Sequence, residues 1–445
     1  MTSLVKRLII FAGFSEVEQV VSHKNFKVYL IGHIPNVIGV WVVRVAMGWL
    51  AWELTESAFW LGAIAAADSL PVLLLGPIGG VLADRLDRRS LSIATQAALC
   101  VISVFLALLT MSDLITIWLL FFLALMRGIT FAFWQPVRLS LMPTLVPRDE
   151  IPIAIALNSS TFNTAQFVGP AVASGLLTLG GPSLAFIFNI FAAGVMVWAF
   201  MAIDVPKTKS IKKKRSSIYS EMVDGMRYSL NHSGIAPMLF ILLIMGTGIR
   251  PLTELMPGFA DLVFGLDVGG YSLMVSSVGL GAMCGAIWML RRGNRGGITG
   301  VALRSGLLGG ASALLFSLTG WLPLALLCLS LLGFSMTSSG IATQQLIQLN
   351  VSDELRGRVL SLFGMIFRAG PALGALFMGW VADFAGLSWP VGIGAAIGLF
   401  AYLLVYRRRE QISELLEQEK VLLSTSKDSI PFISSEVSPT ERVAE

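Results

Sequence analysis

Residues 79–91 read GGVLADRLDRRSL, and this charged stretch decides how the rest of the chain is interpreted. It carries five charged side chains and lies between two long apolar runs. Hydrocarbon cannot stabilise such a cluster, so we expect it at a membrane surface, where it would join two membrane-spanning helices. An ordinary basic loop of any membrane protein would satisfy the same pattern, and the remaining sequence has to decide between the two interpretations.

The composition predicts an integral membrane protein. Of the 445 residues, 55% are hydrophobic and 13% are charged, and the mean hydropathy is +0.77. Soluble domains carry about 25% charged residues, and a water-soluble body cannot bury this much apolar surface. The net charge of +5 is spread over short loops between apolar runs. That placement indicates membrane orientation and argues against a nucleic-acid partner.

Twelve apolar segments are long enough to cross a membrane, which takes about 20 residues each. We therefore expect an all-α integral membrane protein with twelve transmembrane helices in two six-helix bundles. The expected spans are residues 26–52, 58–83, 89–111, 115–135, 152–178, 183–203, 237–260, 270–290, 298–319, 322–347, 359–384 and 388–406.

The loops between these spans alternate in charge. One side of the membrane receives all the Lys and Arg residues of the loops, and the other receives Glu53, Glu56, Asp113, Asp261 and Asp267 with no Lys or Arg. Since cytoplasmic loops carry an excess of basic residues, both termini are predicted to be cytoplasmic. The protein is thus expected in the cell (inner, cytoplasmic) membrane as a multi-pass protein.

The longest internal loop divides the spans six and six. The expected organisation is a cytoplasmic N-terminal segment (1–24), an N-terminal bundle (25–204), a basic and amphipathic cytoplasmic linker (205–236), a C-terminal bundle (237–407) and a cytoplasmic tail (408–445). Corresponding spans of the two halves each contain a Gly-Pro pair, Gly169-Pro170 and Gly370-Pro371, where we expect helix kinks. Repeated halves are typical of secondary transporters.

The charged stretch resembles the loop signature of the major facilitator superfamily, Gly-x-x-x-Asp-Arg-x-Gly-Arg-Arg, with Asp87 in the position of the second glycine. The closer likeness is to the branch of enterobactin exporters and macrolide-efflux proteins. It is carried by WLAWELT (49–55), PVLLLGP (71–77), ALNS (156–159) and RGRV (356–359). The likeness covers residues 25–406.

The resemblance implies a cytoplasmic gate made by the signature residues, in which the Asp84 carboxylate meets the N-terminus of the eleventh span. These residues are Gly80, Asp84, Arg85, Arg88 and Arg89. Two departures weaken the transfer of a proton-antiport mechanism: Val40 stands where related exporters often carry an acid, and the glycine run after Pro170 is thin. Residues 379–383 have similar spacing on the opposite side, but they have no basic partners, so we interpret the similarity as a coincidence.

Ionisable side chains inside the spans are candidates for substrate or proton contact, because each costs at least about 2.5 kcal/mol at this depth. Spacing suggests two pairs, Arg44 with Asp68 and Arg250 with Glu254. Arg127 and Arg368 have no local partner and would suit an anionic substrate group or a neighbouring carboxylate. Pairs that only neutralise buried charge and fix helix packing are the alternative. Uncharged polar candidates for the cavity wall are Asn163, Gln166 and Gln344.

Several classes of function are not supported by any motif. The sequence has no phosphate-binding loop, no His-Glu-x-x-His zinc motif and no Gly-x-Ser-x-Gly elbow, so we predict no enzyme, no cofactor and no metal site. Energy for uphill transport would come from an ion gradient. The prediction is a monomeric, proton-coupled exporter of a small, amphiphilic organic molecule, working by alternating access among membrane lipids. Uptake by the same fold and movement of lipids or lysolipids are the alternatives.

Overall fold

The computed structural model describes residues 17–204, 226–293 and 296–417. The description does not include the surroundings of Gly80 or the side chains of Asp84, Arg85 and Asn163. The basic run 207–215 of the linker also lies outside the described residues. Within the described residues every regular element is a helix. The long helices are α2 (Lys24–Thr55), α3 (Ala58–Arg85), α4 (Arg88–Met111), α5 (Ile117–Leu141), α6 (Ile151–Ala202), α8 (Ile235–Ile244), α10 (Val268–Arg292), α11 (Ile298–Leu318), α12 (Leu322–Asn350), α13 (Asp353–Ala385) and α14 (Ser388–Arg407).

Short polar residues fix where several helices begin. The Asp87 carboxylate accepts a hydrogen bond from the Ser90 backbone N–H at 2.8 Å and so caps α4. Asp267 caps α10 in the same way, through the Gly269 N–H at 2.9 Å. These caps satisfy N–H groups that a helix cannot pair internally. They place the ends of the apolar segments close to the predicted positions.

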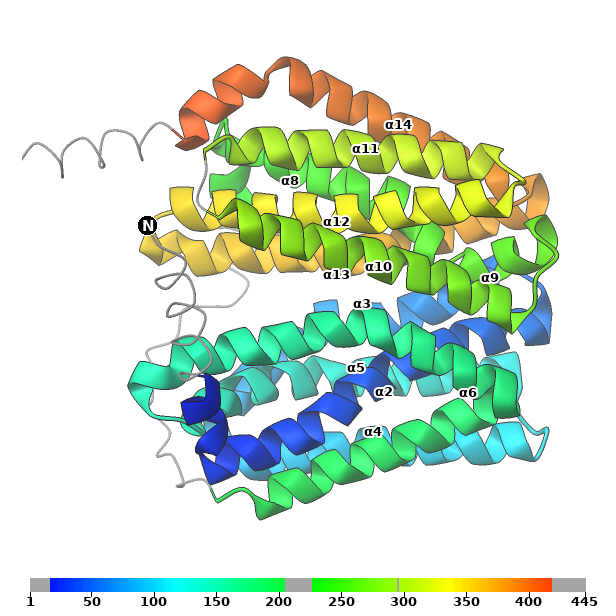
Figure 1. Cartoon of the computed structure of the whole chain (residues 1–445), viewed down its shortest axis with the longest axis vertical. Helices are drawn as coiled ribbons and strands as arrows, with labels where there is room; N and C mark the ends of the chain where they lie inside the picture. Colours follow the sequence, from blue (N-terminus) through cyan, green and yellow to red (C-terminus); the bar gives the residue numbers. More distant parts are fainter. Residues whose placement is uncertain (1–16, 205–225, 294–295, 418–445) are drawn as a thin grey trace, which may run out of the picture.

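The helices form two bundles, which lie one above the other in Figure 1. Helices α2 to α6 make one bundle and α8 to α14 make the other, and the bundles touch mainly where α3 packs on α13 and α6 packs on α10. Eleven helices of the described chain are long and apolar enough to cross a membrane. One of them, α6, has 52 residues with non-helical backbone at Gly180 and Gly181. At 1.5 Å per residue it would be about 78 Å long, more than twice the hydrocarbon thickness, so it makes two crossings and the total is twelve.

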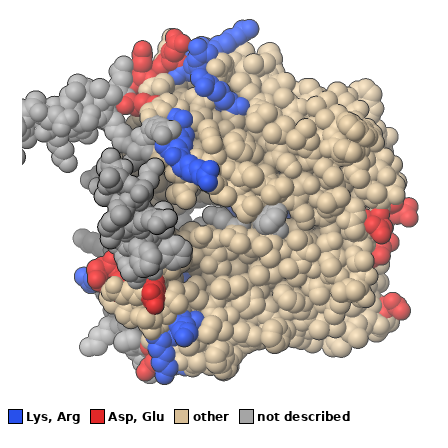
Figure 2. All heavy atoms as spheres, in the orientation of Figure 1, with Lys and Arg blue, Asp and Glu red and all other residues tan. Residues whose placement is uncertain are grey.

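Charge separates the two ends of the molecule. Figure 2 shows Lys and Arg side chains at one end of the visible face and only Asp and Glu at the opposite end. We call these the basic end and the acidic end. The first and last described residues, 17 and 417, both lie at the basic end, as an even number of crossings requires.

The seventh span differs from prediction. Residues 237–260 were expected to form one regular helix, but α8 gives way to a π-helical turn η3 (Met245–Ile249), a 3-10 turn η4 (Arg250–Thr253), the short α9 (Met256–Gly258) and a second π turn η5 (Phe259–Val263). Glycines and prolines at 246, 248, 251 and 257 explain the irregularity, since they favour or force departures from α geometry. Irregular turns of this kind often lie at functional sites.

The bundles are in contact at the acidic end. Asp383 at the end of α13 accepts hydrogen bonds from the Ala58 N–H at 2.8 Å and the Ser57 hydroxyl at 2.7 Å, at the start of α3. The Trp52 indole N–H donates to Asp261 at 2.8 Å. A Cβ at Gly379 would lie 2.2 Å from the Ala58 carbonyl oxygen, so only glycine allows this approach. Residues 379–383 thus join the two bundles, and the partner of Asp383 is a helix N-terminus and not a basic side chain.

The chain after α14 turns back under the C-terminal bundle. Residues 409–417 are helical, and their apolar side chains Ile412 and Leu416 are buried in the core. The Glu417 carboxylate accepts hydrogen bonds from the backbone N–H groups of Gly297 at 2.5 Å and Thr299 at 2.8 Å, and so caps α11. Burial raises the pKa of Glu417, but the hydrogen bonds from Thr299 and Gly297 outweigh it and hold the pKa below its ordinary value of 4.5.

Replacing Glu417 with glutamine is expected to loosen this segment, because the neutral amide loses the charge attraction to the helix N-terminus, a contribution of about 1 kcal/mol. Since the folded-state pKa is lowered, the stabilisation is present at neutral pH and is lost as the pH falls through that pKa. Hydrogen exchange of residues 409–417 should be faster in Glu417→Gln at pH 7, with the difference shrinking in acid. Glu414→Gln, on the exposed side of the same helix, is the matched control. Equal exchange in the two variants would contradict the capping role.

Candidate functional site

A cavity of 130 Å³ lies between the bundles, and most of the ionisable residues singled out in the sequence line it. Its walls come from α2, α3, α5, α6, α10, α12 and the irregular seventh span. The predicted residues among the lining are Arg44, Asp68, Arg127, Gln166, Pro170, Arg250 and Glu254. Aromatic and aliphatic side chains supply the rest of the wall, with Trp41 and Tyr271 among them. A polar and charged lining at membrane depth is the arrangement expected of a transport site.

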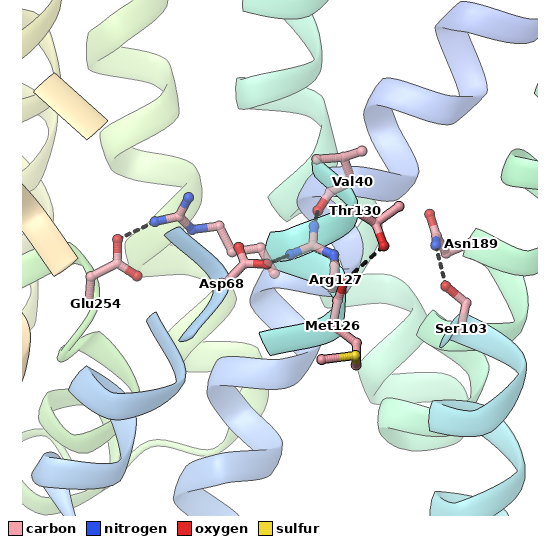
Figure 3. Close-up of polar contacts among 9 residues, drawn as sticks. Val40, Asp68, Ser103, Met126, Arg127, Thr130, Asn189 and Glu254 are labelled. Atoms are coloured by element: carbon pink, nitrogen blue, oxygen red, sulfur yellow. Dashed lines mark hydrogen bonds and ion pairs between the residues drawn. The ribbon is translucent and has the colours of Figure 1, made fainter. Parts of the chain in front are cut away.

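The first ion pair lies inside the N-terminal bundle. Arg127 of α5 donates to the Asp68 carboxylate of α3 at 2.5 Å and to the Val40 carbonyl oxygen at 3.2 Å (Figure 3). The Phe131 ring covers the guanidinium, 4.7 Å from its carbon to the ring centroid. Only 6% of the Arg127 side chain and 15% of the Asp68 side chain are exposed. A buried charge that loses its partner is strongly destabilising, so neither residue can change charge without affecting the other.

The second ion pair joins the two bundles. Arg44 of α2 contacts Glu254, which follows η4 in the C-terminal bundle. The Arg44 guanidinium also lies over the Trp41 ring, 5.8 Å from the centroid. Beyond this pair, toward the acidic end, Trp49 of α2 stacks on Tyr271 of α10 at 5.9 Å. The Arg44–Glu254 pair therefore joins the two bundles within the cavity wall, and the Trp49–Tyr271 stack joins them nearer the acidic end.

Both predicted pairings were wrong, for different reasons. Arg250 and Glu254 were expected to be neighbours on an α-helical face, but the 3-10 turn η4 changes the rotation between them. Asp68 was expected to pair with Arg44, but it bonds to Arg127, which had been assigned no local partner. Arg44 still interacts electrostatically with Asp68 as well as with Glu254. Arg44, Asp68, Arg127 and Glu254 therefore interact with one another, but as the pairs Arg44–Glu254 and Arg127–Asp68.

Two further arginines have no carboxylate bonded to them among the described residues. Arg250 donates to the Phe367 carbonyl oxygen at 2.7 Å, and its guanidinium lies 4.1 Å from the centroid of the Phe367 ring. Its Nε is buried and has no hydrogen-bond partner. Arg368 is the next residue of α13 after Phe367, is exposed, and forms no hydrogen bond with any described residue. It interacts electrostatically with Arg44 and Arg250 and lies next to Phe367, the partner of Arg250, although it is not one of the residues that line the cavity.

Arg138 was missed by the sequence analysis because the fourth span was expected to end at residue 135, whereas α5 continues to Leu141. The side chain is 6% exposed. It lies 3.2 Å from His33 Nε2, donates to the Asn158 amide oxygen at 3.3 Å, and covers the Trp134 ring at 4.8 Å. A usable signal was present: Arg138 comes eleven residues after Arg127, three helical turns along the same face.

The remaining predicted cavity residues have mixed placements. Gln166 lines the cavity, while Gln344 of α12 is exposed and is not among the lining residues. The side chain of Asn163 lies outside the described part. Pro170 and Pro371 each lie inside a helix. The glycines before them allow close helix contact, since a Cβ at Gly169 would lie 2.4 Å from Trp41 Cβ.

The predicted gate is described only in part, because the description does not include the surroundings of Gly80 or the side chains of Asp84 and Arg85. Arg89 donates from Nε to the Phe200 carbonyl oxygen at 2.9 Å and also contacts the Met201 carbonyl. It therefore satisfies the C-terminal carbonyls of α6 within its own bundle. Arg88 lies beside it at the first position of α4 and also has an interaction partner.

Comparison with known proteins gives consistent results. Residues 19–435 match a family model described as "Transmembrane secretion effector". The chain is 25% identical to a staphyloferrin A transporter of Staphylococcus aureus, over 79% of this chain and 87% of that protein. It is 24% identical to macrolide efflux protein A of Streptococcus pyogenes (82% and 91% covered) and to an enterobactin exporter of Escherichia coli O1:K1 (86% and 90%).

Solved structures show the same fold at low sequence identity. A peptide-transporter (POT) family member in complex with a thioalcohol-conjugated peptide superposes with a TM-score of 0.70 at 10% identity, covering 89% of this chain and 99% of that one. A bacterial homologue of the human lysosomal transporter Spinster gives 0.65 at 14% identity, covering 91% and 98%. These relatives are transporters and not enzymes. From the family match and the fold, the chain belongs to the transmembrane secretion effector family, a branch of secondary transporters in the major facilitator superfamily with efflux proteins among its relatives.

Proposed function

We propose that this protein exports a small organic molecule from the cell by proton-driven antiport. The observation that supports it most directly is the pair of acid–arginine contacts in the central cavity, one within a bundle and one between bundles. A proton that neutralises Asp68 or Glu254 removes the attraction to its arginine, and for Glu254 this weakens a contact between the bundles. Proton binding is thereby linked to which end of the cavity is open.

The contacts of Asp383 and Trp52 at the acidic end, and the Arg44–Glu254 pair at the cavity, join the two bundles and support a state in which this end is closed. Opening this end while the basic end closes would expose the cavity to the opposite side of the membrane. In this scheme the basic end, with both termini, faces the cytoplasm of the cell membrane, and Asp84 with its neighbouring arginines closes that end in the other state. One chain contains the whole cavity, so a monomer is sufficient.

The test compares small molecules in cells and spent medium of a deletion strain, of a strain complemented with the intact protein, and of one complemented with Asp68→Asn. Export predicts a compound that accumulates inside the deletion strain, is depleted outside, and is restored only by the intact protein. The reverse distribution would mean uptake and would overturn the direction. If the strains differ only in the composition of their lipid extracts, the transported molecule is a lipid.

A further inference from the structure

The cavity and its surroundings have more positive than negative side chains. Among the described residues, the arginines there are 44, 127, 138, 250 and 368, and the carboxylates are Asp68 and Glu254. Both carboxylates are already bonded to arginines. The three arginines that remain, Arg138, Arg250 and Arg368, use neutral carbonyl, amide and ring partners or no partner at all. Such an excess is costly at membrane depth unless an anion offsets it.

The geometry of Arg250 and Arg368 favours a ligand over internal packing. Arg250 makes two contacts with Phe367: one guanidinium N–H donates to the carbonyl oxygen, and the plane of the guanidinium lies over the ring. The Nε of Arg250 is buried and has no hydrogen-bond partner. Arg368 is exposed and comes directly after Phe367, the partner of Arg250, so two like charges lie close together and repel each other. A planar guanidinium binds carboxylate or phosphate oxygens in pairs, which suits a shared anionic group.

An aromatic surface adjoins these arginines. Phe363 and Phe367 lie one turn apart on α13 with rings stacked at 5.7 Å and 16°. Arg138 on α5 belongs to the other bundle and interacts electrostatically with Arg368, so a molecule held between these two arginines would meet a cation on each side. The ligand that satisfies both features has acidic groups on a flat, apolar body.

We infer that the transported molecule is an aromatic organic anion whose acidic groups bind Arg250 and Arg368 and then reach toward Arg138. This assignment rests on the proposed transport function and specifies its substrate class. An anion that bridges the arginines of the two bundles would also draw the bundles together at the level of the cavity. Binding would then favour the movement that exchanges one open end for the other.

The experiment uses two xanthene dyes of similar shape and opposite charge, carboxyfluorescein and rhodamine 123. Their binding to the purified full-length protein is measured by fluorescence anisotropy, and their efflux is measured from loaded cells. We expect carboxyfluorescein to bind and to be exported, and Arg250→Gln and Arg368→Gln each to raise its Kd about ten-fold, the effect of losing one charge-assisted contact. Arg368→Lys should retain part of the affinity. Rhodamine 123 should not bind better to the intact protein than to the variants.

The matched control is Arg304→Gln, which removes the same charge from an exposed position on α11 beside Tyr406. It should leave the Kd unchanged. Tighter binding of rhodamine 123 than of carboxyfluorescein, no carboxyfluorescein binding at millimolar concentration, or no effect of either cavity variant would overturn the inference. If lysophosphatidylglycerol displaces bound carboxyfluorescein better than phthalate does, the anionic group that binds the arginines belongs to a lipid headgroup, and the inference of an aromatic organic anion is wrong.

Failure of this inference can be told apart from failure of the proposed function. If rhodamine 123 is exported and carboxyfluorescein is not, export is upheld and the substrate class is wrong. If neither dye moves and the deletion strain shows no difference in metabolites, the proposed function itself has failed.

Discussion

Asp68→Asn is expected to reduce gradient-driven export at least about ten-fold while the protein remains folded in the membrane. The substitution keeps the shape of the side chain and a hydrogen-bond acceptor for Arg127, but it removes the group that can take up and release a proton. Export should therefore lose its dependence on the pH gradient. The measurement is efflux of the substrate, or of a dye that the protein exports, from energised vesicles at several external pH values.

A purely structural role for the pair would give a different set of results. Losing one member of a buried ion pair costs about 3–5 kcal/mol, whereas replacing both members is far less costly. Asp68→Asn should thus lower thermal stability more than the double variant Asp68→Asn/Arg127→Gln. If the pair only supports packing, export should recover in the double variant along with stability. If Asp68 carries the proton, export stays low in both.

Asp113→Asn is the control for removing one carboxylate. Asp113 lies in a loop at the acidic end and has a positive φ of 56°, which asparagine adopts readily, so the fold should tolerate the change. Normal pH-dependent export by Asp68→Asn would exclude Asp68 as the coupling site and leave Glu254 as the candidate.

Much of the fold could be predicted from the sequence because hydrocarbon imposes simple rules. Apolar length, loop charge and glycine breaks define where a chain crosses a membrane, and nearly all helix ends agree with prediction within a few residues. Two ends differ more, because α5 ends at Leu141 and not at 135, and α13 begins at Asp353 and not at 359. The seventh span differs in its interior, where the residues allow more than one local geometry. Gly246, Gly248 and Pro251 break the seventh span into π and 3-10 turns, and hydropathy cannot detect this.

The sequence predicts which residues belong to the candidate site, but it does not predict how they pair. Burial cost identifies Arg44, Asp68, Arg127 and Glu254, and all four line one cavity. Their pairing depends on how separate helices are rotated and stacked, and spacing along one helix contains no information about this. Arg138 was missed because the fourth span was expected to end at residue 135, although α5 continues through Pro136 to Leu141.

Breaking the Arg44–Glu254 contact is expected to open the acidic end. Because Arg44 is 39% exposed on its side chain, solvent screens the interaction, and the contribution is about 1 kcal/mol, or a five-fold change in population. In Glu254→Gln and Arg44→Gln, a cysteine placed at Ala65 in the cavity wall should react with an impermeant thiol reagent from the outside about five-fold faster. The background variant has Cys100, Cys284 and Cys328 replaced by alanine.

Reversing both charges separates this contact from general loosening of the cavity. In Arg44→Glu/Glu254→Arg the two side chains can attract each other again, so labelling should return toward the rate of the parent, while each single reversal places like charges together and should be faster still. The exchange cannot restore transport to the same degree, because Arg44 also interacts with Asp68, and the reversed pair would place an acid beside that carboxylate. Slow labelling with poor export in the double reversal would therefore show that Arg44 serves two functions: it closes the acidic end through Glu254 and connects that closure to Asp68. Labelling that stays fast in the double reversal would mean that the pair does not control the opening, and that Asp383 and Trp52 close this end without it.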